Sequence, residues 1–410
     1  MSSFTLPARG GGRPTTIHID TVMLLLVSSI VLLGLIVVAS ASMSIGTKES
    51  GDPFIYLERQ FVLVMVGSFA AACALAVRTE WLERFAPLLL SGAFLLLVAV
   101  LIPGVGHVVN GSRRWIRLAG FNFQASEAAR VMVLVFIASY AVRREAELRS
   151  SFMGLAKPLG VVGVFFGLLL LEPDFGAATV LAATAFGVLF IAGARLRDVL
   201  ALAVVGAGLL ATLAVSSPYR LRRLTSFLDP WQDPFNSGFQ LTQSLIAIGR
   251  GGWTGVGLGE SVQKLFYLPD AHTDFLFAVL SEELGLLGIL LTIGLFVALA
   301  LRALWVARIA NEADLKFPAY LAAGFGLWVA MQAFINMGVN MGLLPTKGLT
   351  LPFMSYGRSS MIVTLAWVGM VLRVYHEAVQ ASRGTAAASL RGTHAVSRAR
   401  DGGSAEALQA

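Results

Sequence analysis

Long apolar runs dominate the chain, and short polar segments separate them. A run of roughly 18 or more apolar residues is long enough to cross the hydrocarbon core of a bilayer as a helix. Counted from the start, the runs lie near 21–46, 61–77, 86–102, 125–142, 158–171, 176–194, 199–216, 275–301, 317–338 and 359–372. The pattern predicts an all-α polytopic membrane protein of about ten transmembrane helices, with a large extracytoplasmic loop, 217–274, between the seventh and eighth. The fifth and tenth runs are short, and only Glu172–Phe175 separates the fifth from the sixth.

The polar segments carry an orientation signal. Lysine and arginine accumulate in the tails and in the connections after the even-numbered runs, which is typical of cytoplasmic segments. We therefore expect a multi-pass protein with both termini in the cytoplasm. Residues 1–16 and 381–410 lack an apolar period, so we expect disordered tails on either side of one transmembrane domain, 17–380.

Composition supports this class. The chain is 56% hydrophobic and 13% charged, whereas a soluble domain has about 25% charged residues. A large soluble domain is therefore excluded. The single cysteine, Cys73, forms no intramolecular disulfide. We expect no nucleic acid among the partners.

Two outward connections hold positive charge that the orientation rule does not predict. The compact connection 103–124 contains Arg113, Arg114 and Arg117, and the long loop contains further arginines and Lys264. A phosphorylated or pyrophosphorylated substrate would explain these residues. Binding to lipid headgroups explains the charge equally well, and charge alone does not separate the two.

Ionisable residues also lie inside or beside the runs. Glu127 and Arg130 are three residues apart in the fourth run, so on a helix they form an ion pair or shape a polar pocket. Asp274 stands where the eighth run begins, either as a helix N-cap or as a catalytic carboxylate. Asp270, His272 and Asp274 alternate, which is a weak signal for a divalent ion.

The last outward connection, 336–360, contains prolines, glycines and Lys347. This composition predicts non-helical backbone from Asn336 onward. Such backbone is tolerated at membrane depth where it lines a cavity, so we expect it to form a wall of the same site as Asp274.

Several segments together resemble the SEDS family of bacterial cell-wall polymerases over about 20–380. The segments that carry the resemblance are Asn110–Trp115, Gln124–Glu127, Glu172–Gly176, Gly257–Lys264, Ala271–Phe275, Glu282–Gly285 and Ser355–Gly357, in the family's order. Lys264–Pro269 and Leu344–Pro352 are similar to the division-type members rather than to the elongation-type members. The chain departs from the family at Ala125, Arg130, Asp270 and Arg358, where proline, lysine, glutamate and glycine are usual.

The resemblance implies a peptidoglycan glycosyltransferase that polymerises lipid II for septal wall synthesis. Asp274 would be the catalytic base, and a divalent cation, Mg²⁺ or Mn²⁺, held at Asp274 would assist the pyrophosphate leaving group. The residues expected to bind the substrate or shape its pocket are Arg113, Arg114, Glu127, Arg130, Gln263, Lys264, His272, Glu283, Lys347 and Ser355.

The resemblance also implies partners and a location. The partners would be an FtsI-like class B penicillin-binding protein and other divisome membrane proteins, namely FtsQ-, FtsL-, FtsB- and FtsN-like proteins. The location would be the division septum of the bacterial inner membrane. Three other functions stay open: a lipid II flippase, an elongation-type polymerase, and a scaffold that recruits a transpeptidase. Because the polar motifs gather on the outward side, whereas a transporter needs access from both faces, we favour the enzyme.

Overall fold

The computed structural model describes residues 2–5, 16–109, 112–118, 121–215, 226–236, 238–346 and 348–406. Most of these residues are helical. The helices are α1 (Thr21–Ser50), α2 (Ile55–Ala76), α3 (Thr79–Arg84), α4 (Ala86–Leu101), α5 (Ala125–Arg143), α6 (Glu145–Ser150), α7 (Phe152–Leu171), α8 (Phe175–Ile191), α9 (Leu196–Val215), α11 (Phe239–Gly251), α12 (Leu276–Glu312), α13 (Lys316–Asn340) and α14 (Arg358–Glu406). Strands β1 (Ser2–Thr5) and β2 (Thr16–Ile19) form one antiparallel pair, and β3 (Gly106–Val109), β4 (Ser112–Leu118) and β5 (Phe121–Gln124) form a three-stranded sheet.

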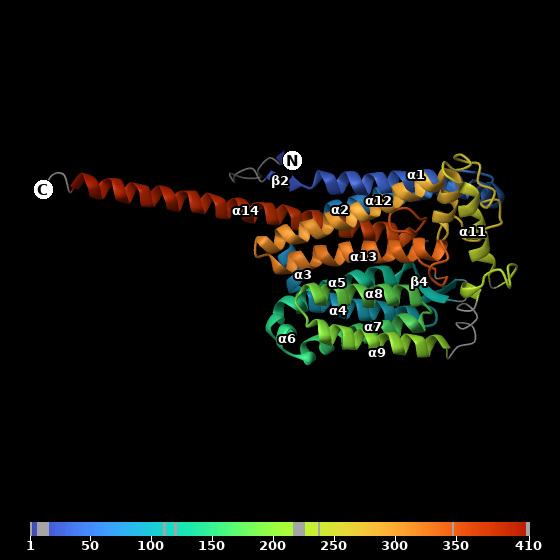
Figure 1. Cartoon of the computed structure of the whole chain (residues 1–410), viewed down its shortest axis with the longest axis horizontal. Coiled ribbons are helices and arrows are strands. Elements are labelled where there is room, and N and C mark those ends of the chain that lie inside the picture. The colour runs from blue at the N-terminus through green and yellow to red at the C-terminus, as the bar shows by residue number, and fades with distance from the viewer. Residues whose placement is uncertain are drawn as a thin grey trace.

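The long helices form a bundle and run along its length (Figure 1). Within the described residues, 7 helices are long and apolar enough to cross a membrane, and α4 and α8 are shorter apolar helices. Each predicted run coincides with a helix, which confirms the helical membrane class. Several helices continue beyond their runs: α12 extends to Glu312, because charged residues outside the hydrocarbon still favour helix.

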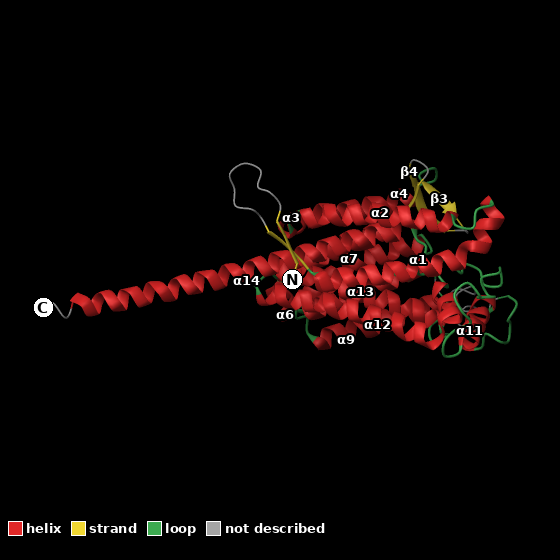
Figure 2. Cartoon of the chain, turned by 90° about the horizontal axis from the view of Figure 1, so that it is seen from above, coloured by secondary structure: helices red, strands yellow, loops and turns green. Residues whose placement is uncertain are grey.

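The two ends of the bundle differ. Both termini and α6 lie at one end, and α11 and the sheet of β3–β5 lie at the other (Figure 1). The two small sheets lie toward opposite ends of the bundle (Figure 2). The predicted outward connections therefore share one end of the molecule.

Small residues allow close helix packing. α14 packs against α2, where Gly369 lies so close that an added Cβ would be 2.1 Å from the carbonyl oxygen of Ala71. Gly34 of α1 similarly meets the backbone of Met354. Such contacts replace the hydrophobic driving force that is absent between helices in lipid. Aromatic residues fill the centre, where the rings of Trp328 and Trp367 stack at 5.2 Å.

Some elements of the structure were not predicted from the residue pattern. The compact connection 103–124 contains the sheet of β3–β5, and the long loop contains the amphipathic helix α11. At the termini, β1 pairs with β2, and α14 continues to Glu406 through a segment rich in alanine and arginine, which favour helix. Residues 1, 6–15 and 407–410 lie outside the described residues, and the expected disorder of the tails stays a prediction. The prediction of non-helical backbone from Asn336 onward is wrong for its first residues, because α13 extends to Asn340.

Candidate active site

Asp274 lies in the turn that leads into α12 and does not cap that helix. The N-cap position is Phe275, which has no side-chain capping bond, and no hydrogen bond from the described residues reaches the Asp274 carboxylate. Asn340 of α13 supplies the cap, because its Oδ1 accepts a hydrogen bond from the backbone N–H of Ala278 at 3.2 Å. The capping role that competed with catalysis at Asp274 is therefore filled by another residue.

The environment of Asp274 changes its acidity. The pKa of Asp274 is raised to about 7: burial is the largest cause, the negative charges of Asp270 and Asp174 act in the same direction, and the positive charge of Arg114 opposes them. Removing water penalises the charged form of a carboxyl, which is why burial acts in this direction. A carboxyl with a pKa near the working pH is well suited to act as a general base.

Arg114 and Asp174 lie in the surroundings that set this acidity. Asp174 is the N-cap of α8 and accepts hydrogen bonds from Ala177 N at 3.0 Å and Ser126 Oγ at 3.2 Å. Arg114 of β4 is half-buried, and its Nη1 lies 3.9 Å from Asp174 Oδ2. A second nitrogen, Nη2, donates to Ser112 Oγ at 3.0 Å. The β3–β5 sheet thus brings a guanidinium to the acidic end of α8.

Glu172, at the end of α7, was not among the predicted site residues. Its side chain is fully buried, and neither carboxyl oxygen has a hydrogen-bond partner among the described residues. Burial raises the pKa of Glu172 to about 8, and the charge of Asp174 adds to the shift while Arg114 opposes it. The neutral acid therefore predominates at pH 7. The sequence signal was its position between two apolar runs that only a four-residue segment separates.

Glu127 and Arg130 form the predicted ion pair on α5, with Arg130 Nη2 on Glu127 Oε2. Arg130 Nη1 also donates to Gln332 Oε1 at 3.1 Å, and Gln332 Nε2 donates to the carbonyl of Thr350 at 2.9 Å. Both charged side chains are buried. The ion pair therefore links α5 to α13 and, through Gln332, to the last outward connection. These contacts hold that connection in place beside the site.

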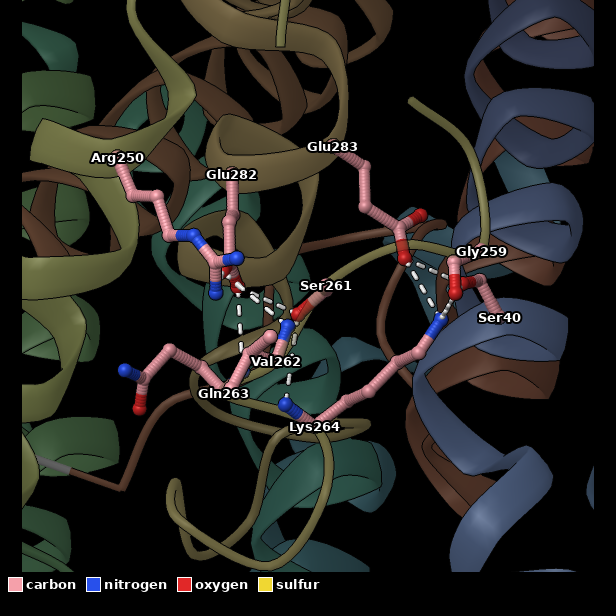
Figure 3. A network of polar contacts seen from close by, with 9 residues as sticks. All are labelled: Ser40, Arg250, Gly259, Ser261, Val262, Gln263, Lys264, Glu282 and Glu283. Carbon is pink, nitrogen blue, oxygen red and sulfur yellow. Dashed lines mark hydrogen bonds and ion pairs between the residues drawn. The ribbon is translucent and has the colours of Figure 1, made fainter. Parts of the chain in front are cut away.

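The long loop is attached to α12 by Glu282, whose carboxylate is fully buried (Figure 3). Oε1 accepts from Arg250 Nη1 and Val262 N, both at 3.2 Å. Oε2 accepts from Ser261 Oγ at 2.5 Å and Gln263 N at 3.3 Å. Two donors at each oxygen satisfy a buried carboxylate, so Glu282 and Gln263 hold the loop in place. The Gln263 side chain is buried, and its Oε1 accepts no hydrogen bond from the part of the chain that the structure describes.

Lys264 and Glu283 form a second attachment beside the first (Figure 3). The ammonium of Lys264 is buried and donates to Glu283 Oε1 at 2.9 Å, Ser40 Oγ at 2.8 Å and the Gly259 carbonyl at 2.6 Å. An ammonium has three N–H groups, and all three are used. Within the described residues the three Lys264 donors are used inside the protein, whereas Glu283 Oε2 accepts no bond, and substrate binding by either residue stays a prediction.

A break in α12 lets the loop dock there. Gly285 has φ 62 and ψ −158, so the helix is interrupted just after the two glutamates. Their backbone carbonyls accept hydrogen bonds from Val256 N at 3.0 Å and Gly257 N at 3.1 Å. Only glycine adopts this backbone conformation without strain. The outer segment of α12 is consequently held by the loop rather than by an uninterrupted helix.

The other predicted residues are placed as follows. His272 lies between two tyrosine rings, 5.0 Å from Tyr56 and 5.6 Å from Tyr356, and burial lowers the pKa of His272.

Arg113 donates to the Leu101 carbonyl at 3.1 Å. Ser355 is buried, and its Oγ accepts from Leu351 N at 2.9 Å, so it shapes the last outward connection. Lys347 lies outside the described residues.

Two asparagines of α13 contact Asp274 and were missed. Asn336 Nδ2 and Asn340 Nδ2 both donate to the Asp274 carbonyl, at 2.9 Å and 3.1 Å. They are four residues apart, so they share a face of α13. Two asparagines at that spacing beside a predicted span were the available signal.

Asp274 is the one residue predicted to hold the divalent cation. Within the described parts of the chain, no three His, Cys, Asp or Glu side chains gather as a metal site, so the alternation of Asp270, His272 and Asp274 does not form one. Mg²⁺ needs only one or two carboxylates beside substrate phosphates. Asp274 fits that limited requirement, and the cation stays a prediction.

Comparison with known proteins gives consistent matches. A family model for FtsW/RodA/SpoVE, described as cell cycle protein, matches residues 20–380. A protein of Thioalkalivibrio sulfidiphilus named probable peptidoglycan glycosyltransferase FtsW is 53% identical over 363 residues, which are 88% of this chain and 91% of the relative. A protein of Nitrosococcus halophilus with the same name is 51% identical over 91% of this chain and 96% of its own length.

Solved structures agree with these matches. A chain from a peptidoglycan synthase complex that coordinates polymerization and crosslinking superposes with a TM-score of 0.74, at 31% identity, over 89% of this chain and 99% of its own. The rod shape determining protein RodA of Thermus thermophilus superposes with a TM-score of 0.66, at 29% identity, over 88% of this chain and 98% of its own.

Proposed function

The chain belongs to the FtsW/RodA/SpoVE family of cell cycle proteins, and we propose that it polymerises lipid II with Asp274 as the general base. It is a peptidoglycan glycosyltransferase in a polytopic helical membrane fold. The observation that supports the assignment of the base is a carboxylate with no hydrogen bond from the described residues, whose pKa burial raises to about 7.

The chemistry follows from the bonds that change. Asp274 removes the proton from the attacking sugar hydroxyl, whose oxygen forms a bond to the anomeric carbon of the donor lipid II. The bond from that carbon to the pyrophosphate oxygen breaks, and undecaprenyl pyrophosphate leaves with the electron pair. The proton then resides on Asp274, and a pKa near 7 allows its return to water.

Positive charge near Asp274 serves the leaving group. Arg114 is half-buried and close enough to Asp274 to affect its pKa, so we assign it to the departing pyrophosphate. Arg113 and Lys347 belong to the same proposal. Lys264 does not, because Glu283, Ser40 and Gly259 already use its three donors. Asp274 would hold the predicted divalent cation, which would supply charge stabilisation for the leaving group.

The relatives support a division role and a transpeptidase partner. The curated relatives at about 50% identity carry the name FtsW, and the structural neighbour comes from a complex that polymerises and crosslinks. We therefore propose a class B penicillin-binding protein as the partner, together with FtsQ-, FtsL-, FtsB- and FtsN-like proteins. The same reasoning proposes enrichment at the septum, with both termini in the cytoplasm.

The test is lipid II polymerisation by the purified protein with its partner transpeptidase. Asp274→Asn keeps the size of the side chain and removes the base, so we expect a rate loss of about 100-fold or more. Asp270→Asn is the matched control, because it removes a neighbouring carboxylate and leaves the base in place. Glycan chains resolved on a gel report the product.

Two results would count against the proposal. Full activity of Asp274→Asn would remove Asp274 as the base. Movement of lipid II across vesicle bilayers without any glycan product from the wild-type protein would favour the flippase instead.

A further inference from the structure

We propose that Asn336 and Asn340 are positioning residues for Asp274, which they hold by its backbone while Asn340 caps α12 in its place. The proposal deepens the proposed function, since it rests on Asp274 being the base. Its first support is direct contact: both side-chain amides donate to the Asp274 carbonyl, at 2.9 Å and 3.1 Å. A carbonyl oxygen has two lone pairs, and the two amides use both.

Asn340 joins three segments through one side chain. Its Oδ1 accepts from Ala278 N at 3.2 Å, and its Nδ2 donates to the carbonyls of Asp274 and Asn336, at 3.1 Å and 2.8 Å. Only an amide combines these donor and acceptor roles at that size. The first turn of a helix leaves backbone N–H groups without partners, and an aspartate beside that turn would ordinarily satisfy one of them. The N–H of Ala278 donates both to Asn340 and to the Phe275 carbonyl, the latter at 3.0 Å, so the first turn of α12 does not use the Asp274 carboxylate as its cap.

Asn336 holds the segment around Gly348 and Leu349 in place relative to Asp274. Its Nδ2 also donates to the Leu349 carbonyl at 2.5 Å. At the preceding residue, Gly348, an added Cβ would lie 3.1 Å from Asp274 Oδ2. One amide thus sets both the backbone of Asp274 and the segment that lies against its carboxylate.

Burial makes these bonds strong and leaves no substitute for them. Asn340 is 0% exposed and Asn336 is 2% exposed, so water does not replace a lost amide. A buried carbonyl without its donors is costly, and the turn would move to find others. Catalytic rates are sensitive to such movement, since a displacement of about 1 Å costs up to about 100-fold.

The experiment compares two variants with a control of similar burial. Asn336→Leu removes the donations to Asp274 and Leu349 and adds no charge. Asn340→Asp keeps an oxygen for Ala278 N and loses the donor to Asp274. Thr292→Val is the control, because Thr292 is buried in α12 and its hydroxyl, among the described residues, bonds only the Gly288 carbonyl of its own helix.

Steady-state polymerisation of lipid II is measured at pH 8.5, where Asp274 is ionised, together with the melting temperature of each purified protein. We expect kcat to fall about tenfold or more in both asparagine variants, with KM unchanged, because neither residue contacts substrate. The melting temperature of Asn340→Asp should lie below that of the control, because the change leaves two buried carbonyls without their donor and buries a carboxylate beside them. A kcat equal to that of the control in a folded asparagine variant would overturn the proposal.

A second measurement separates positioning from a merely structural role. Each asparagine change is repeated in the Asp274→Asn background, and the residual rates are compared. Residues that act through Asp274 produce no further loss once the carboxylate is gone. A further loss as large as in the wild-type background would overturn the proposal. If one variant does not fold, the other is judged by the same criteria, and if neither folds, a purely structural role is the result.

The two proposals fail in different ways. Full activity of Asp274→Asn itself would refute the base. Inactivity of Asp274→Asn, with both asparagine variants equal to Thr292→Val, would refute positioning alone.

Discussion

The pH dependence of polymerisation follows from the raised pKa of Asp274. With a pKa of about 7, the ionised fraction of Asp274 falls from about nine-tenths at pH 8 to about one-tenth at pH 6. Only the ionised carboxylate accepts a proton, so kcat/KM should fall about tenfold across that interval. A carboxyl with the ordinary value of 3.8 would stay ionised throughout and would produce no change.

The assay is the initial rate of lipid II polymerisation by the reconstituted protein and its partner between pH 5.5 and 8.5. Asp270→Asn supplies the internal check, because the negative charge of Asp270 raises the pKa of Asp274. Without that charge the pKa is lower, and the acid limb of the profile should move to lower pH. A rate that is constant from pH 8 to pH 6 would refute the reasoning, and so would an acid limb that moves upward in Asp270→Asn.

Three further predictions concern the attachment of the loop to α12. Glu283→Gln leaves the Lys264 ammonium buried without its counter-charge, so the free energy of unfolding in detergent should fall by about 3–5 kcal/mol. Adding Lys264→Met to Glu283→Gln removes both charges, and denaturant titration should show most of the stability restored; an equally unstable double variant would contradict the pairing. Gly251→Ala should lower both stability and activity, because its Cβ would lie 2.0 Å from the carbonyl oxygen of Ser281, whereas Gly249→Ala, with nothing within 4 Å, should melt no lower than wild type.

Local residue pattern was sufficient wherever the physics is local. The helical spans followed from apolar runs, since a backbone in lipid must satisfy its own hydrogen bonds and a helix does so. The pairing of Glu127 with Arg130 followed from their spacing of three residues on one helix. The sheet of β3–β5 was not anticipated, because short paired strands near arginines do not show a clear alternation of polar and apolar residues.

Roles that depend on distant neighbours were not readable in this way. Lys264 had the chemistry of a phosphate ligand in the sequence, and its partners Ser40 and Glu283 are separated from it by 224 and 19 residues. A buried charge pairs with whichever counter-charge the tertiary structure places beside it, and the local sequence does not show which residue that is. The break at Gly285, which admits the loop, is likewise visible only in the folded chain.

Asp274 illustrates which properties follow from the sequence and which depend on the tertiary structure. The sequence by itself determined the membrane class, the helical spans and the presence of a carboxylate where the eighth span begins, because these follow from composition and spacing. Only the tertiary structure decided that the carboxylate does not cap α12 and accepts no hydrogen bond from the described residues, since Asn340, 62 residues after Ala278, accepts a bond from the first turn of that helix. Packing around the turn also decided its acidity, because desolvation is a property of the surroundings and not of the residue.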